Sequence, residues 1–196
     1  MRAVLALVAF CFVGTVSPGP NNAILWASGT RFGLARTMPH VLGTVVGMAA
    51  LVVAVALGLG SLVDALPGAD LTLRIGGSAY MLYLAYLVAG AGVAARAEIS
   101  RPLSIPQAAV FQWLNPKAWI FALAVVATFT TSTSATGSVG AVALVGVVAV
   151  IVLSSSSMWA AGGAGLGALI ERDRARRAAS IALAVVLIAS VALLWI

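Results

Sequence analysis

The chain has 196 residues, of which 62% are hydrophobic and only 8% are charged. A soluble domain carries about 25% charged residues, so this composition excludes a soluble core and indicates that lipid is the solvent. The single cysteine, Cys11, excludes an internal disulfide, and the single histidine, His40, argues against a multi-histidine metal site. The net charge of +6 comes from basic residues in short loops between apolar spans. It therefore reports membrane topology and not a nucleic-acid partner.

Six apolar stretches are long enough to cross a bilayer, which takes about 20 residues. In chain order they cover residues 3–29, 39–62, 71–93, 106–129, 138–165 and 178–196. The first is interrupted at 17–22 and the fourth at 115–117. Arg2 and the apolar run to Val16 also fit the outline of a signal peptide, but no mature soluble domain follows. We expect one integral membrane domain over residues 1–196.

Arginines sort the loops between these spans into two kinds. The first, third and fifth loops hold eight arginines: Arg31, Arg36, Arg96, Arg101, Arg172, Arg174, Arg176 and Arg177. The second and fourth loops hold none. The positive-inside rule places the arginine-bearing loops in the cytoplasm, so both termini are expected to face outward. Arg2 does not fit this orientation, because it places a positive charge at the N-terminus that is expected to face outward.

Six spans divide into two groups of three, with halves of approximately 1–98 and 99–196. Pro18 and Pro116 lie half a chain length apart, one in each half. A three-span unit that is duplicated must insert upside down the second time, which is the layout of an inverted-repeat transporter. We therefore predict an all-α membrane protein, a 3+3 inverted-repeat bundle of six transmembrane helices whose first and fourth helices are interrupted.

The first interruption reads Ser-Pro-Gly-Pro-Asn-Asn. Prolines lack an N–H donor and clash with the preceding turn, so the helix is expected to open here. A half-helix would begin near Asn21, where free N–H groups and the helix dipole favour a carboxylate. The opened carbonyls before it would suit an ammonium group. This segment contributes the predicted substrate-binding residues Pro18, Gly19, Pro20, Asn21 and Asn22; a simple proline kink is the alternative.

The second interruption contains Lys117, the only lysine of the chain. A charge at membrane depth costs roughly 3 kcal/mol or more, so this side chain either meets a substrate carboxylate or snorkels to the cytoplasmic headgroups. Pro116 is expected to free a carbonyl one turn upstream, near Gln112. Gln112 and Asn115 are three residues apart and would line the same cavity. The predicted substrate-binding residues of this segment are Gln112, Asn115, Pro116 and Lys117.

Other polar residues in the spans have less specific interpretations. Gly43 and Gly47 form a small-xxx-small pair that favours close helix packing. Ser154 to Ser157 in the fifth span are expected to serve packing, with a polar path as the alternative. His40 is expected to be solvated at a membrane boundary, with a proton relay as the alternative. The five acids all fall in or beside loops: Asp64, Asp70, Glu98, Glu171 and Asp173.

Three stretches together resemble the LysE/RhtB family of bacterial amino-acid exporters. The first is Ser17-Pro18-Gly19-Pro20-Asn21, followed by spaced glycines, and the second is the run from Arg74 to Tyr86. The third is Phe111-Gln112-Trp113-Leu114-Asn115-Pro116-Lys117-Ala118-Trp119. Here Trp113 stands where the commoner form of the motif has a smaller residue. Pro18, Gly19, Pro20, Asn21, Asn115, Pro116 and Lys117 match the signature positions of the family.

The resemblance implies a multi-pass exporter of the bacterial inner membrane, driven by the proton motive force, with an amino acid or its derivative as substrate. The absence of a predicted mid-depth acid favours a small neutral substrate over lysine or arginine, because a second cation would lack a partner. A basic amino-acid exporter and a non-transporting membrane scaffold are the alternatives. We expect no enzyme activity, cofactor, metal or nucleic-acid partner. The expected partners are the substrate, the lipid bilayer and a possible second copy of the chain.

Overall fold

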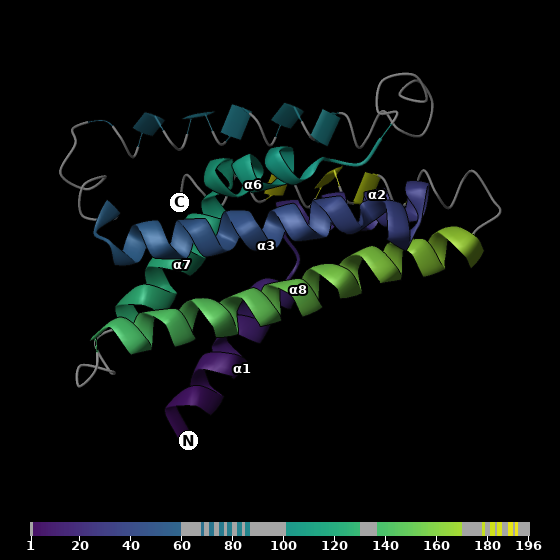
Figure 1. Ribbon diagram of the computed structural model, residues 1–196. Coiled ribbons are helices and arrows are strands. Elements are labelled where there is room, and N and C mark those ends of the chain that lie inside the picture. Colours follow the sequence, from purple (N-terminus) through teal and green to yellow (C-terminus); the bar gives the residue numbers. More distant parts are fainter. Residues whose placement is uncertain are drawn as a thin grey trace.

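The structure, a computed structural model, describes residues 2–59, 101–129 and 137–169 continuously, with scattered positions between 68 and 86 and between 178 and 191. Within these residues it defines six helices and no strand. They are α1 Arg2–Val16, α2 Pro20–Phe32, α3 Leu34–Ala56, α6 Ile105–Leu114, α7 Pro116–Phe129 and α8 Gly137–Leu169 (Figure 1). The all-α prediction is confirmed for this part of the chain.

The predicted spans are recovered in part. Within the described residues, α3 and the Gly140–Gly165 part of α8 are each long and apolar enough to cross a membrane. The pair α6 and α7 makes a third candidate span that bends by 74° at its break. The predicted spans 71–93 and 178–196 lie outside the continuously described residues. The 3+3 arrangement therefore stays a prediction.

Both predicted interruptions are confirmed as breaks between two helices. α1 ends at Val16, and α2 begins at Pro20 after Gly19, whose backbone is extended (φ −176°, ψ 176°). α6 ends at Leu114, and α7 begins at Pro116 after Asn115 (φ −96°, ψ 107°). In both cases a proline is the first helical residue, the position where its missing N–H leaves no helical bond unmade. The prolines thus start the second half-helices and do not merely kink one helix.

The junction of α2 and α3 depends on Gly33. Its φ of 79° lies in the left-handed region that glycine adopts without strain, and its N–H donates to the Gly29 carbonyl at 2.9 Å. The chain can therefore restart at once, and α3 begins at Leu34, earlier than the expected residue 39. As a consequence, His40 lies inside the helix and is fully buried. The expectation of a solvated boundary histidine is wrong.

Helix α3 lies between α6 and α8 (Figure 1) and packs against both. It approaches α6 closely at the predicted small-xxx-small pair. A Cβ atom on Gly43 would lie 2.7 Å from the Cβ of Ala108, and one on Gly47 would lie 2.7 Å from the Cα of Ala109. α2 packs against α8 in the same manner, with Gly163 against the backbone of Trp26. Small residues set the helix spacing, as expected for packing in lipid.

Among the described residues, apolar side chains form the buried core and also cover much of the outer surface. Large apolar side chains are exposed on the outer faces of the helices, including Val110 at 58%, Ile120 at 64% and Val142 at 75% exposure. The buried side chains include a polar group from several helices: Asn21, Asn22, His40, Thr44, Gln112, Asn115, Ser155 and Ser156. Such a distribution suits a lipid surround, and intramembrane polar residues that face the bundle interior are candidates for function.

Candidate functional site

The two helix breaks meet in space. The ammonium of Lys117, in the first turn of α7, donates to the Ser17 carbonyl at 2.6 Å, to the Ser17 hydroxyl at 2.8 Å and to the Pro18 carbonyl at 3.1 Å. Ser17 and Lys117 are 100 residues apart in the chain. Because α1 stops at Val16, no following helical turn is present to bond these carbonyls. From the sequence, Lys117 was expected to meet either a substrate carboxylate or the cytoplasmic headgroups. In the structure it instead joins the two breaks, by bonding Ser17 and Pro18.

Asn22 secures the same end of α1. Its Nδ2 donates to the carbonyl of Thr15 at 2.7 Å and to the carbonyl of Ser17 at 3.0 Å. The opened carbonyls were expected to suit an ammonium group, and the ammonium they receive in this structure is that of Lys117. The end of α1 is therefore held by a side chain from each break.

Asn21, in the first turn of α2, is the hub of a buried polar cluster. Its Oδ1 accepts hydrogen bonds from Thr44 Oγ1 at 3.2 Å and from Gln112 Nε2 at 3.0 Å. His40 Nε2 lies 3.4 Å from the same oxygen. Thr44 and His40 come from α3 and Gln112 from α6, so one amide oxygen joins three helices. Buried donors of this kind require an acceptor, which makes the cluster interdependent.

Asn115 forms the N-cap of α7. Its Oδ1 accepts from the Lys117 N–H at 3.1 Å, and its carbonyl accepts from the N–H of Ala118 at 2.9 Å. Its own N–H donates to the Gln112 carbonyl at 3.2 Å. The expectation that Pro116 leaves a carbonyl near Gln112 free is therefore wrong, because the bend at Asn115 turns this N–H back onto it.

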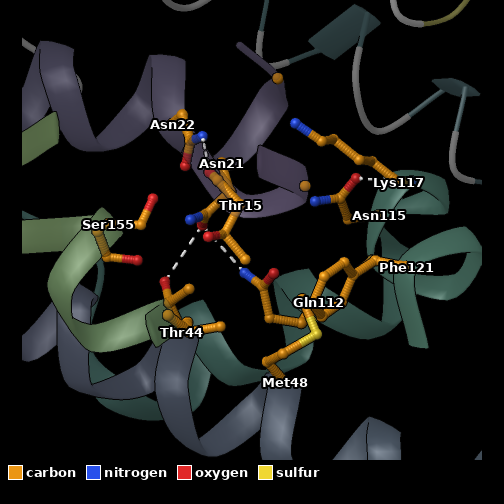
Figure 2. Close-up of a pocket in the computed structure, with 15 residues that line it drawn as sticks. Thr15, Asn21, Asn22, Thr44, Met48, Gln112, Asn115, Lys117, Phe121 and Ser155 are labelled. Atoms are coloured by element: carbon orange, nitrogen blue, oxygen red, sulfur yellow. Dashed lines mark hydrogen bonds between the residues drawn. The ribbon is translucent and has the colours of Figure 1, made fainter. Parts of the chain in front are cut away.

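These residues surround one cavity of about 40 Å³ (Figure 2). Of the predicted site residues, six line it: Gly19, Asn21, Asn22, Gln112, Asn115 and Lys117. The predicted common cavity of Gln112 and Asn115 is confirmed. Pro18, Pro20 and Pro116 do not line it; they shape the two breaks beside it. Lys117 is the one charged residue among the described residues that line the cavity.

Sequence reasoning missed several lining residues from other helices. Thr15 and Thr44 line the cavity, as do Ser155 and Ser156 of α8, which were expected to serve packing. Ser155 is 1% exposed, and its hydroxyl has no hydrogen-bond partner in the described part of the chain. In the view of Figure 2, Ser155 and Asn115 lie on opposite sides of Asn21. The run of four serines in an apolar span was the available signal, whereas nothing in the sequence marked Thr44.

The cavity is small for an organic ligand. A water molecule needs roughly 10–15 Å³ of cavity volume, so about 40 Å³ holds a few water molecules. A zwitterionic amino acid is larger than this space. A ligand of that size would therefore require the surrounding helices to move apart.

Comparison with known proteins gives two matches. Residues 12–196 match the family model described as LysE type translocator. A cysteine/O-acetylserine efflux protein of Klebsiella pneumoniae is 27% identical over 126 residues, which are 64% of this chain and 64% of that protein. The chain thus aligns with just under two thirds of this relative. No solved structure matches the chain.

Proposed function

The chain belongs to the LysE type translocator family, and from this premise we propose that it exports a small neutral amino acid or amino-acid derivative. Export would proceed across the bacterial inner membrane by alternating access, coupled to the proton motive force. The family is one of translocators, and the two helix breaks and the run between them carry the resemblance in this chain. The substrate would bind in the cavity where the breaks meet.

The observation that carries this proposal is the convergence of both breaks on one polar cavity inside an apolar bundle. A chain that only packed in lipid would gain nothing from buried amides, because each needs a partner at that depth. Here Asn21 and Gln112 bond one another at 3.0 Å from opposite halves of the chain. Ser155 adds a buried hydroxyl without a described partner. Such a hydroxyl at a cavity wall is available to a ligand.

The proposed binding mode follows from the groups at the breaks. The substrate carboxylate would lie near the start of α2, where the N–H groups of Asn21 and Asn22 are not bonded within their own helix. The substrate amine would lie near the carbonyls at the end of α1. Asn115 and Lys117 would contribute from the other half, and Ser155 would face the substrate side chain.

A neutral substrate is supported by the charges at the cavity. No carboxylate is among the described residues that line it, and Lys117 already places one positive charge there. A lysine or arginine substrate would add an uncompensated cation at membrane depth, which is costly. The efflux protein of Klebsiella pneumoniae carries cysteine and O-acetylserine in its name, and both are small neutral amino acids. We extend this substrate class to the present chain.

The proposed architecture follows the sequence layout. Residues 1–98 and 99–196 would form two inverted three-span halves of one membrane domain, with both termini outward. The meeting of the first and fourth spans at the cavity supports this arrangement, since inverted-repeat transporters bind their substrates at such a junction. Alternating access would then rock one half against the other about the cavity.

Counterflow in proteoliposomes tests the proposed function. The vesicles are loaded with a pool of unlabelled neutral amino acids and lysine, and uptake of labelled cysteine, serine, threonine and lysine is measured. We expect saturable exchange of at least one of the three neutral amino acids, lost in Asn21→Ala because the hub oxygen is removed. Ser154→Ala is the matched control, because Ser154 is exposed and bonds only its own helix at Val150. Exchange of lysine but of no neutral amino acid would contradict the neutral assignment.

A further inference from the structure

The contacts of Lys117 define a small cage of oxygen atoms. Its ammonium has three N–H donors and meets three acceptors, namely both oxygens of Ser17 and the carbonyl of Pro18, at 2.6, 2.8 and 3.1 Å. All three acceptors are neutral, and all belong to the break after α1. Asn22 braces the cage by donating to the Ser17 carbonyl from the opposite side of the break. This donor count and geometry match a primary ammonium ion.

The lysine stem passes close to the backbone of Gly19. A Cβ atom on Gly19 would lie 2.8 Å from Cδ of Lys117 and 3.0 Å from its Nζ. Gly19 has an extended backbone that any residue can adopt (φ −176°), so its φ does not explain why glycine stands there. Space does, because an added Cβ would require the Lys117 side chain to shift from its present position. The Pro-Gly-Pro segment thus accommodates the ammonium of the other half.

We propose that this cage is the ammonium site of the transporter, that Lys117 occupies it in the closed state, and that the α-ammonium of the substrate replaces Lys117 there. The displaced Lys117 ammonium then pairs with the α-carboxylate of the same substrate. The proposal deepens the proposed function and rests on it. A zwitterion is inserted between Lys117 and the carbonyls of Ser17 and Pro18, and no bond is made or broken covalently.

The charges favour this exchange for one class of ligand. A zwitterion adds no net charge to the cavity, and both the cage and Lys117 keep a partner of the right kind. A simple amine would displace Lys117 and leave two cations without an anion. A simple carboxylate would draw Lys117 away and leave the cage empty. The site therefore selects for an ammonium and a carboxylate on one small molecule.

The exchange also couples binding to movement. In the closed state, Lys117 holds the break after α1 directly against the first turn of α7. A substrate between them lengthens this connection by the size of the amino-acid backbone. The half-helices must separate, which enlarges a cavity that is otherwise too small for the substrate. Substrate binding would thus release the bridge that keeps the two breaks together.

The cage itself is tested without any knowledge of the substrate. In Lys117→Ala, the deleted part of the side chain corresponds to propylammonium, so thermal unfolding is measured in detergent with and without this ion. We expect a saturable rise in the melting temperature of Lys117→Ala and none in the wild type. Trimethylpropylammonium, which has no N–H donor, should give no rise. Arg36→Ala is the control, because it removes one positive charge from an exposed position away from the cavity. An equal response of Lys117→Ala and Arg36→Ala would overturn the cage.

The exchange is tested by competition in counterflow. Each exchanged amino acid is compared with its decarboxylated amine, in wild type and in Lys117→Met, which keeps the stem but removes the charge. In wild type the amine should compete poorly. In Lys117→Met the amine should gain at least about tenfold relative to the parent amino acid, because nothing occupies the cage and no carboxylate partner remains. An unchanged ratio would overturn the exchange.

A second variant guards against misfolding of Lys117→Met. Lys117→Leu is another neutral replacement of the lysine, and it should shift the same ratio in the same direction. Failure of the proposed function and failure of the proposed exchange give different results. If wild type exchanges no amino acid while propylammonium still stabilises Lys117→Ala, the proposed function fails and the ammonium cage stands. If wild type exchanges amino acids but neither variant shifts the ratio, the function stands and the exchange is wrong.

Discussion

Single side chains at the breaks combine a structural and a chemical role. Asn115 caps α7 through its Oδ1, which bonds the Lys117 N–H at 3.1 Å. Its Nδ2 makes no hydrogen bond within the described part of the chain and is available to a ligand. Asn21 divides its amide in the same way, since its Oδ1 is the common acceptor for Thr44 and Gln112. A substitution at either residue therefore changes two properties, which variants must separate.

Asn115→Ser separates them at the second break. Serine is a good N-cap and retains an acceptor for the Lys117 N–H, but it lacks the Nδ2 donor. We expect the melting temperature to stay near that of wild type, while counterflow falls by about tenfold through loss of a hydrogen bond to a charged ligand group. Asn115→Ala, which loses the cap as well, should also lower the free energy of unfolding by about 1 kcal/mol. Normal counterflow in Asn115→Ser would remove Asn115 from the proposed site.

At the scale of the element, the helices are placed by small residues and by the breaks. α3 and α6 approach one another at Gly43 and Gly47, and α7 turns away from α6 by 74° at Asn115. The first contact fixes where Thr44 lies, and the second directs Lys117 toward the end of α1. The glycines of α3 therefore position the cavity without lining it themselves.

Gly47→Ala tests this close packing. The added Cβ would lie 2.7 Å from the Cα of Ala109, closer than real contacts permit, so α6 must shift. Overpacking of this kind typically destabilises by about 1–3 kcal/mol, and we expect a lower melting temperature in detergent. Gly146→Ala on α8 is the matched control, because no atom of the described residues, its own helix backbone aside, lies within 4 Å of its added Cβ. It should be neutral or slightly stabilising, since alanine favours a helix over glycine by roughly 0.5–1 kcal/mol. A melting temperature of Gly47→Ala as high as that of Gly146→Ala would contradict the packing.

At the scale of the whole molecule, the described apolar side chains cover the outer surface as well as the core, and buried polar ones gather at the cavity. Val142 and Ile120 illustrate the outer surface, at 75% and 64% exposure, while Gln112 is 1% exposed. This distribution suits a membrane translocator, in which the path for a polar substrate must be kept away from lipid. The meeting of the two breaks at one cavity is consistent with the proposed inverted halves.

The proposed topology has a direct test in reporter fusions. Arginines in the first, third and fifth predicted loops place those loops in the cytoplasm, so the C-terminus after residue 196 should face outward. We expect a C-terminal alkaline phosphatase fusion to be active and a C-terminal green fluorescent protein fusion to stay dark. A fusion after residue 101, in the third predicted loop, should show the reverse pattern. The opposite result at both sites would invert the proposed orientation.

The sequence by itself determined the membrane class, the two helix breaks and most of the polar residues beside them. These features depend on the residues themselves and not on their tertiary contacts. The composition is too apolar for a soluble protein, and the prolines cannot continue a helix. The amides and the lysine need a polar partner if they lie in lipid. The tertiary structure decided what those residues contact. Lys117 could have met a ligand, a headgroup or a carbonyl, and only the approach of α7 to the end of α1 places it on Ser17 and Pro18. His40, Thr44 and Ser155 became cavity or core residues for the same reason, because long-range helix packing determines which polar groups share one buried space.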